Sequence, residues 1–324
     1  SLTGRFILHR IFHWDLENSQ RLHVGFNLKS YLEFGGYPGS YEFIDSKFDW
    51  LSYIKDSIIT PVIEKDILSM VHVKSPALFR QSFDLICSYA AQEISYTKLL
   101  GQLQDKGNTD LIKSYIELFE AAFLVKSLEK YSGKVVKKRS SSPKLYPLAP
   151  ALYSQAIDMQ FNDEYYGHAF EIFILMELMK LPGKIYYWRE RDFEVDFILE
   201  FGGKLIAIEV KYKSLPETTK GLEAFVTKFE NVVPLVINRD NYRSRLELIR
   251  ELVRAGRCRE YWSSLYYLPV YILKSKVSSS SPDLIDLLSS LTSLFIILTK
   301  YGQKFSSSSV RFLISKGRKR LISL

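Results

Sequence analysis

Apolar residues in the middle of the chain recur first at helical spacing and then at strand spacing. Three segments repeat an apolar face every three to four residues, and they begin at Pro76, Ser95 and Asp110. The loop at 107–109 offers an N-cap for the third segment. Strand-like stretches follow at 123–128 and 134–138, with a turn between them. Three short helices and a basic hairpin predict a winged helix, which is a helix-turn-helix variant.

The second half of the chain predicts a mixed sheet with helices on its faces. A strongly apolar helix at 165–181 precedes a strand at 184–188. Two alternating apolar strands then run from Glu194 to Lys211 and turn at Gly202-Gly203. The remaining predicted elements are a helix at 221–229, a strand at 232–237 and a helix at 244–255. The predicted fold class is therefore α/β in this half and α+β overall.

The two ends of the chain follow no single pattern. Residues 1–75 mix strand-like, turn-rich and helical stretches, and the helices predicted between Asp49 and Met70 are interrupted at Pro61. After residue 274, runs of serine flank an apolar stretch, which predicts a linker and tail. The predicted organisation is a connector at 1–75, a winged-helix domain at 76–150, a sheet domain at 151–274 and a Ser-rich basic tail at 275–324.

The length and composition of the chain indicate about two domains and a cytoplasmic location. The 324 residues are about twice the roughly 150 of a typical domain. Cys87 and Cys258 are the only cysteines, too few for a disulfide framework or a thiolate metal site. No apolar run approaches the roughly 20 residues of a membrane helix, and no signal-peptide pattern opens the chain. We therefore expect a cytoplasmic location and no membrane partner.

The net charge of +8 is concentrated in two segments. Residues 275–324 hold eight Lys or Arg against two Asp, and residues 126–146 hold seven against one Glu, so each segment carries +6. Acidic segments elsewhere offset the second of these. The sequence therefore predicts two basic spots rather than a globally basic surface.

The strand pair from Glu194 to Lys211 is the strongest candidate for chemistry. Side chains alternate faces along a strand, so Glu209 and Lys211 point the same way while their neighbours enter a core. The hairpin brings Asp196 beside them. Carboxylate oxygens next to a lysine are typical of metal-assisted phosphodiester hydrolysis. The alternative is that the acids lie at strand ends in solvent and that Lys211 forms an ordinary surface ion pair.

Several short motifs resemble those of a known family. They are Ser1-Leu-Thr-Gly-Arg5, Phe34-Gly-Gly-Tyr-Pro38, Ser142-Pro-Lys-Leu-Tyr146, Gly167-His-Ala-Phe-Glu171, Tyr187-Trp-Arg-Glu190, Glu194-Val-Asp196 and Ile208-Glu-Val-Lys211. Their order resembles the domain of unknown function that follows the ATPase module in many prokaryotic AAA-type ATP-binding proteins. The resemblance covers about residues 1–274. It implies the end of an ATPase module within 1–75, a winged helix, and a restriction-endonuclease-like, PD-(D/E)XK core at 151–274.

The resemblance also implies roles for four side chains. Glu171 would join Asp196 and Glu209 in holding one or two Mg²⁺ ions, and Lys211 would position the attacking water or stabilise developing charge. The catalytic set implied in this way is Glu171, Asp196, Glu209 and Lys211, with the three acids as metal ligands.

DNA is the partner that the basic hairpin suggests. Contacts would come from Lys113 on the third helix and from the wing, through Lys134, Lys137, Lys138 and Arg139. Winged helices also serve as protein-contact modules, and Asp110, Glu117 and Glu120 on the same helix repel phosphate.

No Gly-x-x-x-x-Gly-Lys-Ser/Thr motif occurs in the chain, so we expect no ATP hydrolysis from it. ATP would enter only through a missing upstream ATPase domain, and the start at Ser1 suggests a fragment or processed product. The first hypothesis is a DNA-associated part of an AAA-type ATPase-related protein that cuts DNA with Mg²⁺. The second is a catalytically inactive module that binds a partner protein or regulates the ATPase domain.

Overall fold

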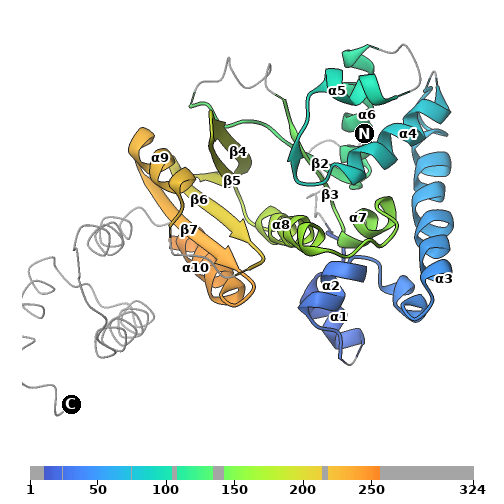
Figure 1. The fold of residues 1–324 in the computed structure, drawn as a ribbon, viewed down its shortest axis with the longest axis horizontal. Helices are drawn as coiled ribbons and strands as arrows, with labels where there is room; N and C mark the ends of the chain where they lie inside the picture. The colour runs from blue at the N-terminus through green and yellow to red at the C-terminus, as the bar shows by residue number, and fades with distance from the viewer. Residues whose placement is uncertain are drawn as a thin grey trace, which may run out of the picture. The chain divides into compact units, whose positions relative to one another are not determined.

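The computed structural model describes residues 11–23, 25–73, 75–103, 108–133, 142–213 and 218–255. All of them belong to one of the two units into which the chain divides, Ser1–Tyr266. Within these residues the fold is mixed α+β, with a three-stranded antiparallel sheet and a four-stranded mixed sheet (Figure 1). The strand predicted at 134–138 and the tail predicted at 275–324 lie outside the described residues.

Short helices form the first part of the described chain. They are α1 (Leu16–Leu22), α2 (Leu28–Phe34), the 3₁₀ helix η1 (Pro38–Phe43) and α3 (Lys47–Ser52). A polar side chain caps each α-helix, because Asp15, Asn27 and Ser46 accept hydrogen bonds from backbone N–H groups of the first turn.

The helix that begins at α3 continues through two π-helical segments, η2 (Tyr53–Ile59) and η3 (Val62–Ile67). The interruption predicted at Pro61 is wrong, since Pro61 itself has helical backbone angles. The N–H of Thr60 bonds to the carbonyl of Lys55, five residues back. Because this wider turn shifts the hydrogen-bond pattern around a residue that has no N–H, the proline fits without ending the helix.

Three helices and the smaller sheet follow. The elements are α4 (Pro76–Ser88), β1 (Gln92–Glu93), α5 (Tyr96–Gln102), α6 (Thr109–Ala121), β2 (Val125–Leu128) and β3 (Lys144–Pro147). The three predicted helices are confirmed, and Asn108 caps α6 as expected. The strand order is β1-β3-β2, so β3 is central and β2 pairs with it from Val125↔Pro147 to Leu128↔Lys144.

The larger sheet and its helices complete the described chain. They are α7 (Pro150–Ala156), α8 (Asp163–Met179), β4 (Lys184–Glu190), β5 (Phe193–Phe201), β6 (Lys204–Lys211), α9 (Lys220–Lys228), β7 (Val232–Asn238) and α10 (Tyr242–Ala255). The strand order is β4-β5-β6-β7, antiparallel except for the parallel pair β6–β7. Gly202 and Gly203 turn the predicted hairpin with φ angles of 58° and 77°, which glycine adopts without strain.

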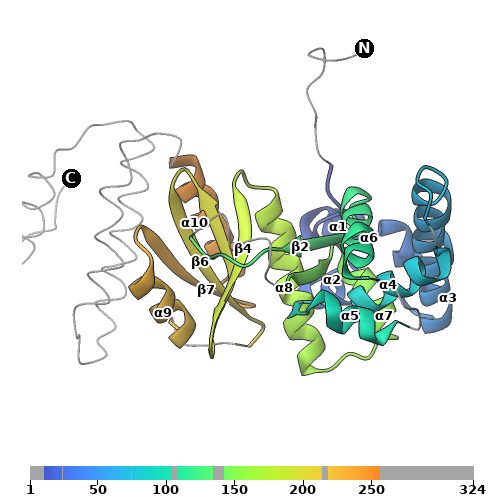
Figure 2. The ribbon, with the colours of Figure 1, turned by 90° about the horizontal axis from the view of Figure 1, so that it is seen from above.

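Helices cover both faces of the larger sheet. Ile206, Ile208 and Val210 of β6 belong to the core that contains α8 and α10, whereas Leu205 and Ala207 pack in the core of α9. Figure 2 shows α9 and α10 on opposite sides of these strands. This alternation puts Glu209 on the side of the sheet opposite Ile208, as the sequence predicted. None of the helices in the described part of the chain is long and apolar enough to cross a membrane.

Candidate functional site

Strands β5 and β6 separate at one end, and the carboxylate of Asp196 lies between the two strands where they no longer pair. The last paired residues there are Phe197 and Ile208. Beyond them, Asp196 Oδ2 accepts a hydrogen bond of 2.9 Å from the backbone N–H of Val210. Lys211 Nζ lies 3.1 Å from Glu209 Oε1 and 3.9 Å from Asp196 Oδ2. The hairpin thus brings Asp196, Glu209 and Lys211 together.

Glu171 reaches the same place from helix α8. This helix starts at the Asn162 cap, and it is so apolar that Glu171 is buried within it. Glu171 Oε2 accepts a hydrogen bond from the Tyr146 hydroxyl and another from Lys144 Nζ, each 3.1 Å long. Glu171 therefore meets Asp196 through a shared ammonium group, because Lys144 Nζ also lies 3.1 Å from Asp196 Oδ1.

Lys144 and Glu194 are the site residues that sequence reasoning missed. The Lys144 side chain is only 3% exposed, and its ammonium contacts Glu171, Glu194 and Asp196 at 3.0–3.1 Å. The feature that identifies Lys144 is structural, since every residue of β3 from Lys144 to Pro147 is buried and a buried lysine must be paired with a carboxylate. Glu194 lies at the edge of the cluster, 3.7 Å from Arg189.

We call Lys144, Glu171, Glu194, Asp196, Glu209 and Lys211 the carboxylate–lysine cluster. Its four carboxylates outnumber its two ammonium groups. Burial, reinforced by the charge of Asp196, raises the pKa of Glu171 to about 8 and that of Glu209 to about 7. Burial also acts to raise the pKa of Asp196, but Lys144 and Lys211 outweigh it and lower that pKa. Without a further cation, the cluster therefore retains protons near neutral pH.

One side of this cluster has a carboxylate oxygen that a divalent cation would satisfy. Glu209 Oε2 is buried and has no hydrogen-bond partner in the described structure, and the other oxygen of Glu209 shares Lys211 with Asp196. Mg²⁺ prefers carboxylate oxygens and needs only one or two carboxylates because it keeps several waters. Over the described ranges, no three His, Cys, Asp or Glu side chains form a group that could hold a metal. A cation at Glu209 Oε2 would have two carboxylates of the cluster beside Lys211, those of Asp196 and Glu209.

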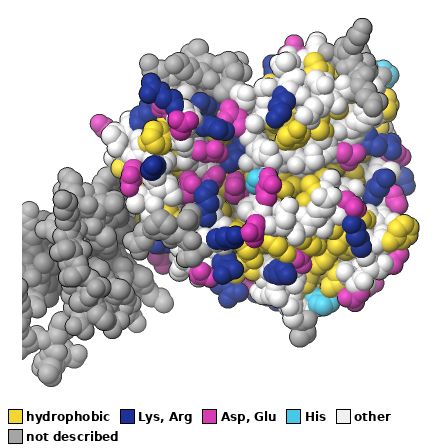
Figure 3. Space-filling model, viewed as in Figure 1, with side chains coloured by type: hydrophobic (Ala, Val, Ile, Leu, Met, Phe, Trp, Pro, Cys, Tyr) yellow, Lys and Arg dark blue, Asp and Glu magenta, His cyan; other side chains and the backbone are white. Residues whose placement is uncertain are grey.

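The predicted DNA contacts are only partly within the described residues. Lys113 on α6 is 43% exposed, but its ammonium lies 3.2 Å from Asp110 Oδ1. The four wing residues, Lys134, Lys137, Lys138 and Arg139, lie outside the described residues. On the face drawn in Figure 3, Lys and Arg side chains are interspersed with Asp and Glu side chains among the described residues.

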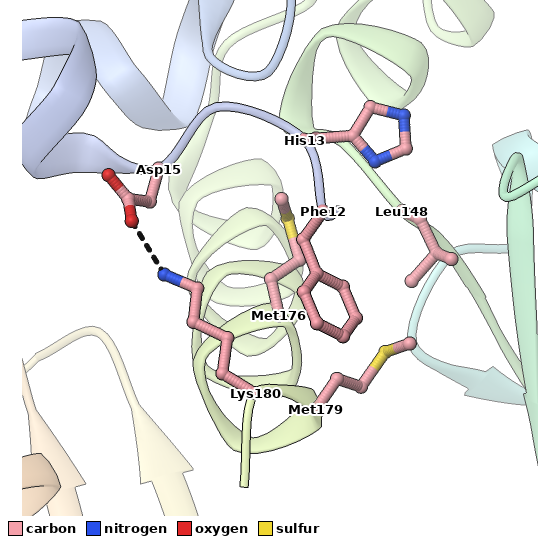
Figure 4. Close-up of a pocket in the computed structure, with 7 residues that line it drawn as sticks. All are labelled: Phe12, His13, Asp15, Leu148, Met176, Met179 and Lys180. Carbon is pink, nitrogen blue, oxygen red and sulfur yellow. Dashed lines mark hydrogen bonds and ion pairs between the residues drawn. The ribbon is translucent and has the colours of Figure 1, made fainter. Parts of the chain in front are cut away.

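A small cavity lies elsewhere in the described structure. It encloses about 10 Å³, and Figure 4 shows its lining by Phe12, His13, Asp15, Leu148, Met176, Met179 and Lys180. This volume holds about one water molecule. Lys180 closes one side through an ion pair of 2.7 Å with Asp15. The cavity contains none of the cluster residues and is too small for a substrate.

Comparisons with known proteins match the chain to domains of unknown function. Residues 25–163 match the family model described as a domain of unknown function (DUF8612). Residues 166–267 match the one described as a domain of unknown function (DUF4143), which often follows AAA ATPase modules. The second match agrees with the coarser part of the resemblance found in the sequence.

The chain is also similar to uncharacterized proteins. It is 26% identical over 179 residues to one of Mycobacterium tuberculosis and to one of Mycobacterium bovis, covering 52% of this chain and 40% of each relative. It is 25% identical over 203 residues to one of Methanocaldococcus jannaschii, covering 60% of this chain and 44% of that protein. The chain thus spans less than half the length of these relatives. No solved structure matches it.

Proposed function

We propose that the carboxylate–lysine cluster hydrolyses DNA phosphodiester bonds with the help of Mg²⁺. The observation that carries this proposal is the unpartnered, buried oxygen of Glu209 beside Asp196 and Lys211. A buried carboxylate oxygen without a partner costs free energy, so a cation that bound there would stabilise the site. The excess of carboxylates over ammonium groups points the same way.

Asp196 and Glu209 would hold the ion. When bound, the metal polarises a phosphate oxygen and lowers the pKa of a coordinated water. Lys211 is 44% exposed, so its ammonium is accessible to a phosphate. Burial acts against its charged form, but Asp196 and Glu209 outweigh burial and raise its pKa. Lys211 therefore stays cationic, and we assign it to orienting the attacking water or to stabilising charge on the phosphate. Lys144 and Tyr146 fix the carboxylate of Glu171.

The arrangement of elements supports this proposal. The order α8, three antiparallel strands, α9 and a parallel strand β7 agrees with the helix, three strands, helix and strand predicted for this half of the chain, which supports the PD-(D/E)XK interpretation. The order α4, β1, α5, α6, β2, β3, with β3 central, suits a winged helix. Residues 166–267 match a domain often found after AAA ATPase modules, which supports the part of the proposal that assigns the chain to an ATPase-related protein. Action on DNA is proposed from the cluster and the basic wing.

The test is nicking of supercoiled plasmid DNA with and without Mg²⁺. Asp196→Ala removes a ligand and Lys211→Ala removes the ammonium, so each variant should lose about 100-fold or more in rate. Lys213→Ala is the matched control. Lys213 lies two residues after Lys211 in the chain, its side chain is 70% exposed, and its ammonium pairs with Asp163 outside the cluster. Equal nicking by wild-type, Asp196→Ala and Lys211→Ala proteins would refute the assignment.

DNA binding is tested separately with a wing variant that replaces Lys137, Lys138 and Arg139 by Ala. Its affinity should fall, and the dependence of log Kd on log salt should become shallower, by about 0.9 for each phosphate that the wing no longer neutralises. Lys113→Ala should have a smaller effect, because Asp110 already offsets the charge of Lys113. Fluorescence anisotropy over a range of salt measures both. An unchanged slope in the wing variant would exclude the wing from the interface.

The second candidate function is an inactive module that binds a partner protein or regulates the ATPase domain. The observation that favours it is Lys144, which already neutralises part of the cluster from within. In this case the cluster would be a buried ion-pair network that only holds the two sheets together. The protein would then show neither Mg²⁺-dependent nicking nor a rise in melting temperature when Mg²⁺ is added.

A further inference from the structure

We propose that the ammonium group of Lys144 takes the place of a second metal ion and limits the cluster to one divalent cation, held by Asp196 and Glu209. The inference rests on the proposed function for the identity of the metal, but its geometric argument concerns Lys144 itself. It makes Lys144 a positioning residue for Glu171 and Asp196.

Lys144 uses all of its hydrogen-bonding capacity within the cluster. A lysine ammonium has three N–H groups, and three different carboxylates lie within 3.1 Å of Lys144 Nζ: those of Glu171, Glu194 and Asp196. The side chain is 3% exposed, so water cannot replace these partners. The ammonium is therefore a fixed cation at the point where Glu171 and Asp196 meet.

A metal ion cannot share this point with Lys144. Mg²⁺ binds carboxylate oxygens at about 2.0–2.1 Å, whereas the oxygens around Lys144 stand 3.0–3.1 Å from the nitrogen. The spacing suits an ammonium group, and a divalent cation placed beside it would be repelled at short range in a buried site. Glu171 is further engaged by the Tyr146 hydroxyl at 3.1 Å.

The side of Asp196 that faces Glu209 and Lys211 is more exposed and less fully hydrogen-bonded than the side that faces Lys144. Lys211 is 44% exposed, and its ammonium lies 3.1 Å from Glu209 Oε1 but 3.9 Å from Asp196 Oδ2, so it has one close carboxylate where Lys144 has three. Glu209 Oε2 has no partner in the described structure. A cation can therefore enter beside Asp196 and Glu209, while the position between Asp196 and Glu171 stays filled.

The chain delivers Lys144 from outside the larger sheet. Lys144 begins β3, the central strand of the smaller sheet, where it pairs with Glu93 and Leu128. It falls within the family match at 25–163, whereas the four acids fall within the match at 166–267. The cluster is therefore built from both matched segments. Through Lys144, the smaller sheet determines how many divalent cations the carboxylates bind.

The experiment counts Mn²⁺ ions bound per chain by electron paramagnetic resonance, with Mn²⁺ as a probe for Mg²⁺. We expect one ion for the wild type, none for Asp196→Asn and two for Lys144→Met, which keeps the length of the side chain without its charge. Lys126→Met is the matched control, because Lys126 lies on the neighbouring strand β2 and pairs with Glu120 at 2.7 Å. It should bind one ion. Circular dichroism verifies folding.

The outcomes separate the inference from the proposed function. One ion in both the wild type and Lys144→Met, with equal affinity, overturns the inference and leaves the function standing. No ion in the wild type but at least one in Lys144→Met overturns the inference as stated, because the native cluster would then hold no cation, and it overturns the metal site of the proposed function as well. No ion in either overturns both. If Lys144→Met fails to fold, the inference is tested by the number of Mn²⁺ ions that the wild type binds. Two ions in the wild type, one of which is lost in Glu171→Gln, would overturn the inference.

Discussion

Gly221 lies where helix α9 touches strand β5, and replacing it with alanine tests that contact directly. A Cβ added at Gly221 would lie 1.9 Å from the backbone carbonyl oxygen of Glu194 and 3.0 Å from its carbon. Backbone atoms cannot rotate away as a side chain can. The helix must therefore move off the strand by about an ångström, and it carries Leu222 and Phe225 out of their packing in the core.

The cost follows from two opposing terms. Overpacking costs about 1–3 kcal/mol, and alanine in a helix is favoured over glycine by about 1 kcal/mol. Because the clash is with backbone, we expect a net loss of about 1–2 kcal/mol for Gly221→Ala. Gly101 in α5 is the matched control, since a Cβ there meets nothing within 4 Å. Gly101→Ala should gain up to about 1 kcal/mol.

Urea denaturation followed by circular dichroism measures both variants against the wild type. The free energies of unfolding of the two variants should differ by about 2 kcal/mol, with opposite signs relative to the wild type. At roughly 2–4 °C for each kcal/mol in a domain of this size, thermal melting should separate them by several degrees. If Gly221→Ala proved as stable as Gly101→Ala, α9 would not pack on the backbone of β5 and the reasoning would be refuted.

Three further predictions concern the cluster and the surface. Tyr146→Phe removes one hydrogen bond to the ionised or neutral Glu171 and should cost about 1–2 kcal/mol in urea denaturation, with Lys144 still in place; a loss under about 0.5 kcal/mol would contradict this role. The pKa of Glu171 is raised from 4.5 to about 8 in the folded protein. This shift stabilises the fold fully below the unfolded pKa of 4.5, and the stabilisation is lost as pH rises through the folded pKa. The metal-free wild type should therefore lose melting temperature between about pH 5 and pH 8, more steeply than Glu171→Gln; equal slopes would be evidence against the shift. Lys47→Met breaks a pair with Asp158 that is 2.8 Å long but 54% and 66% exposed, so it should change stability by less than about 1 kcal/mol, and a larger loss in thermal melting would show that exposure does not weaken this pair.

Local patterns were enough to predict most of the elements. Apolar spacing located α4, α5, α6 and α8, and strict alternation located β5 and β6, because both periodicities are properties of a few consecutive residues. Capping residues fixed the start of α6 at Asn108. Alternation also placed Glu209 and Lys211 on one side of β6. The error at Pro61 was of the same local kind, since apolar spacing does not distinguish an α-helix from a wider π-helical turn.

The composition of the cluster depended on tertiary structure. Lys144 lies 27 residues from Glu171 and 52 from Asp196 along the chain, and no periodicity relates residues so far apart. They meet because the smaller sheet docks against the larger one and presents the first residue of β3 to the place where β5 and β6 no longer pair. The sequence by itself determined which strand ends carry acids and a lysine. Only the packing of two sheets decided that a second lysine lies among those acids, because burial of a charge is a property of all the surfaces that surround it.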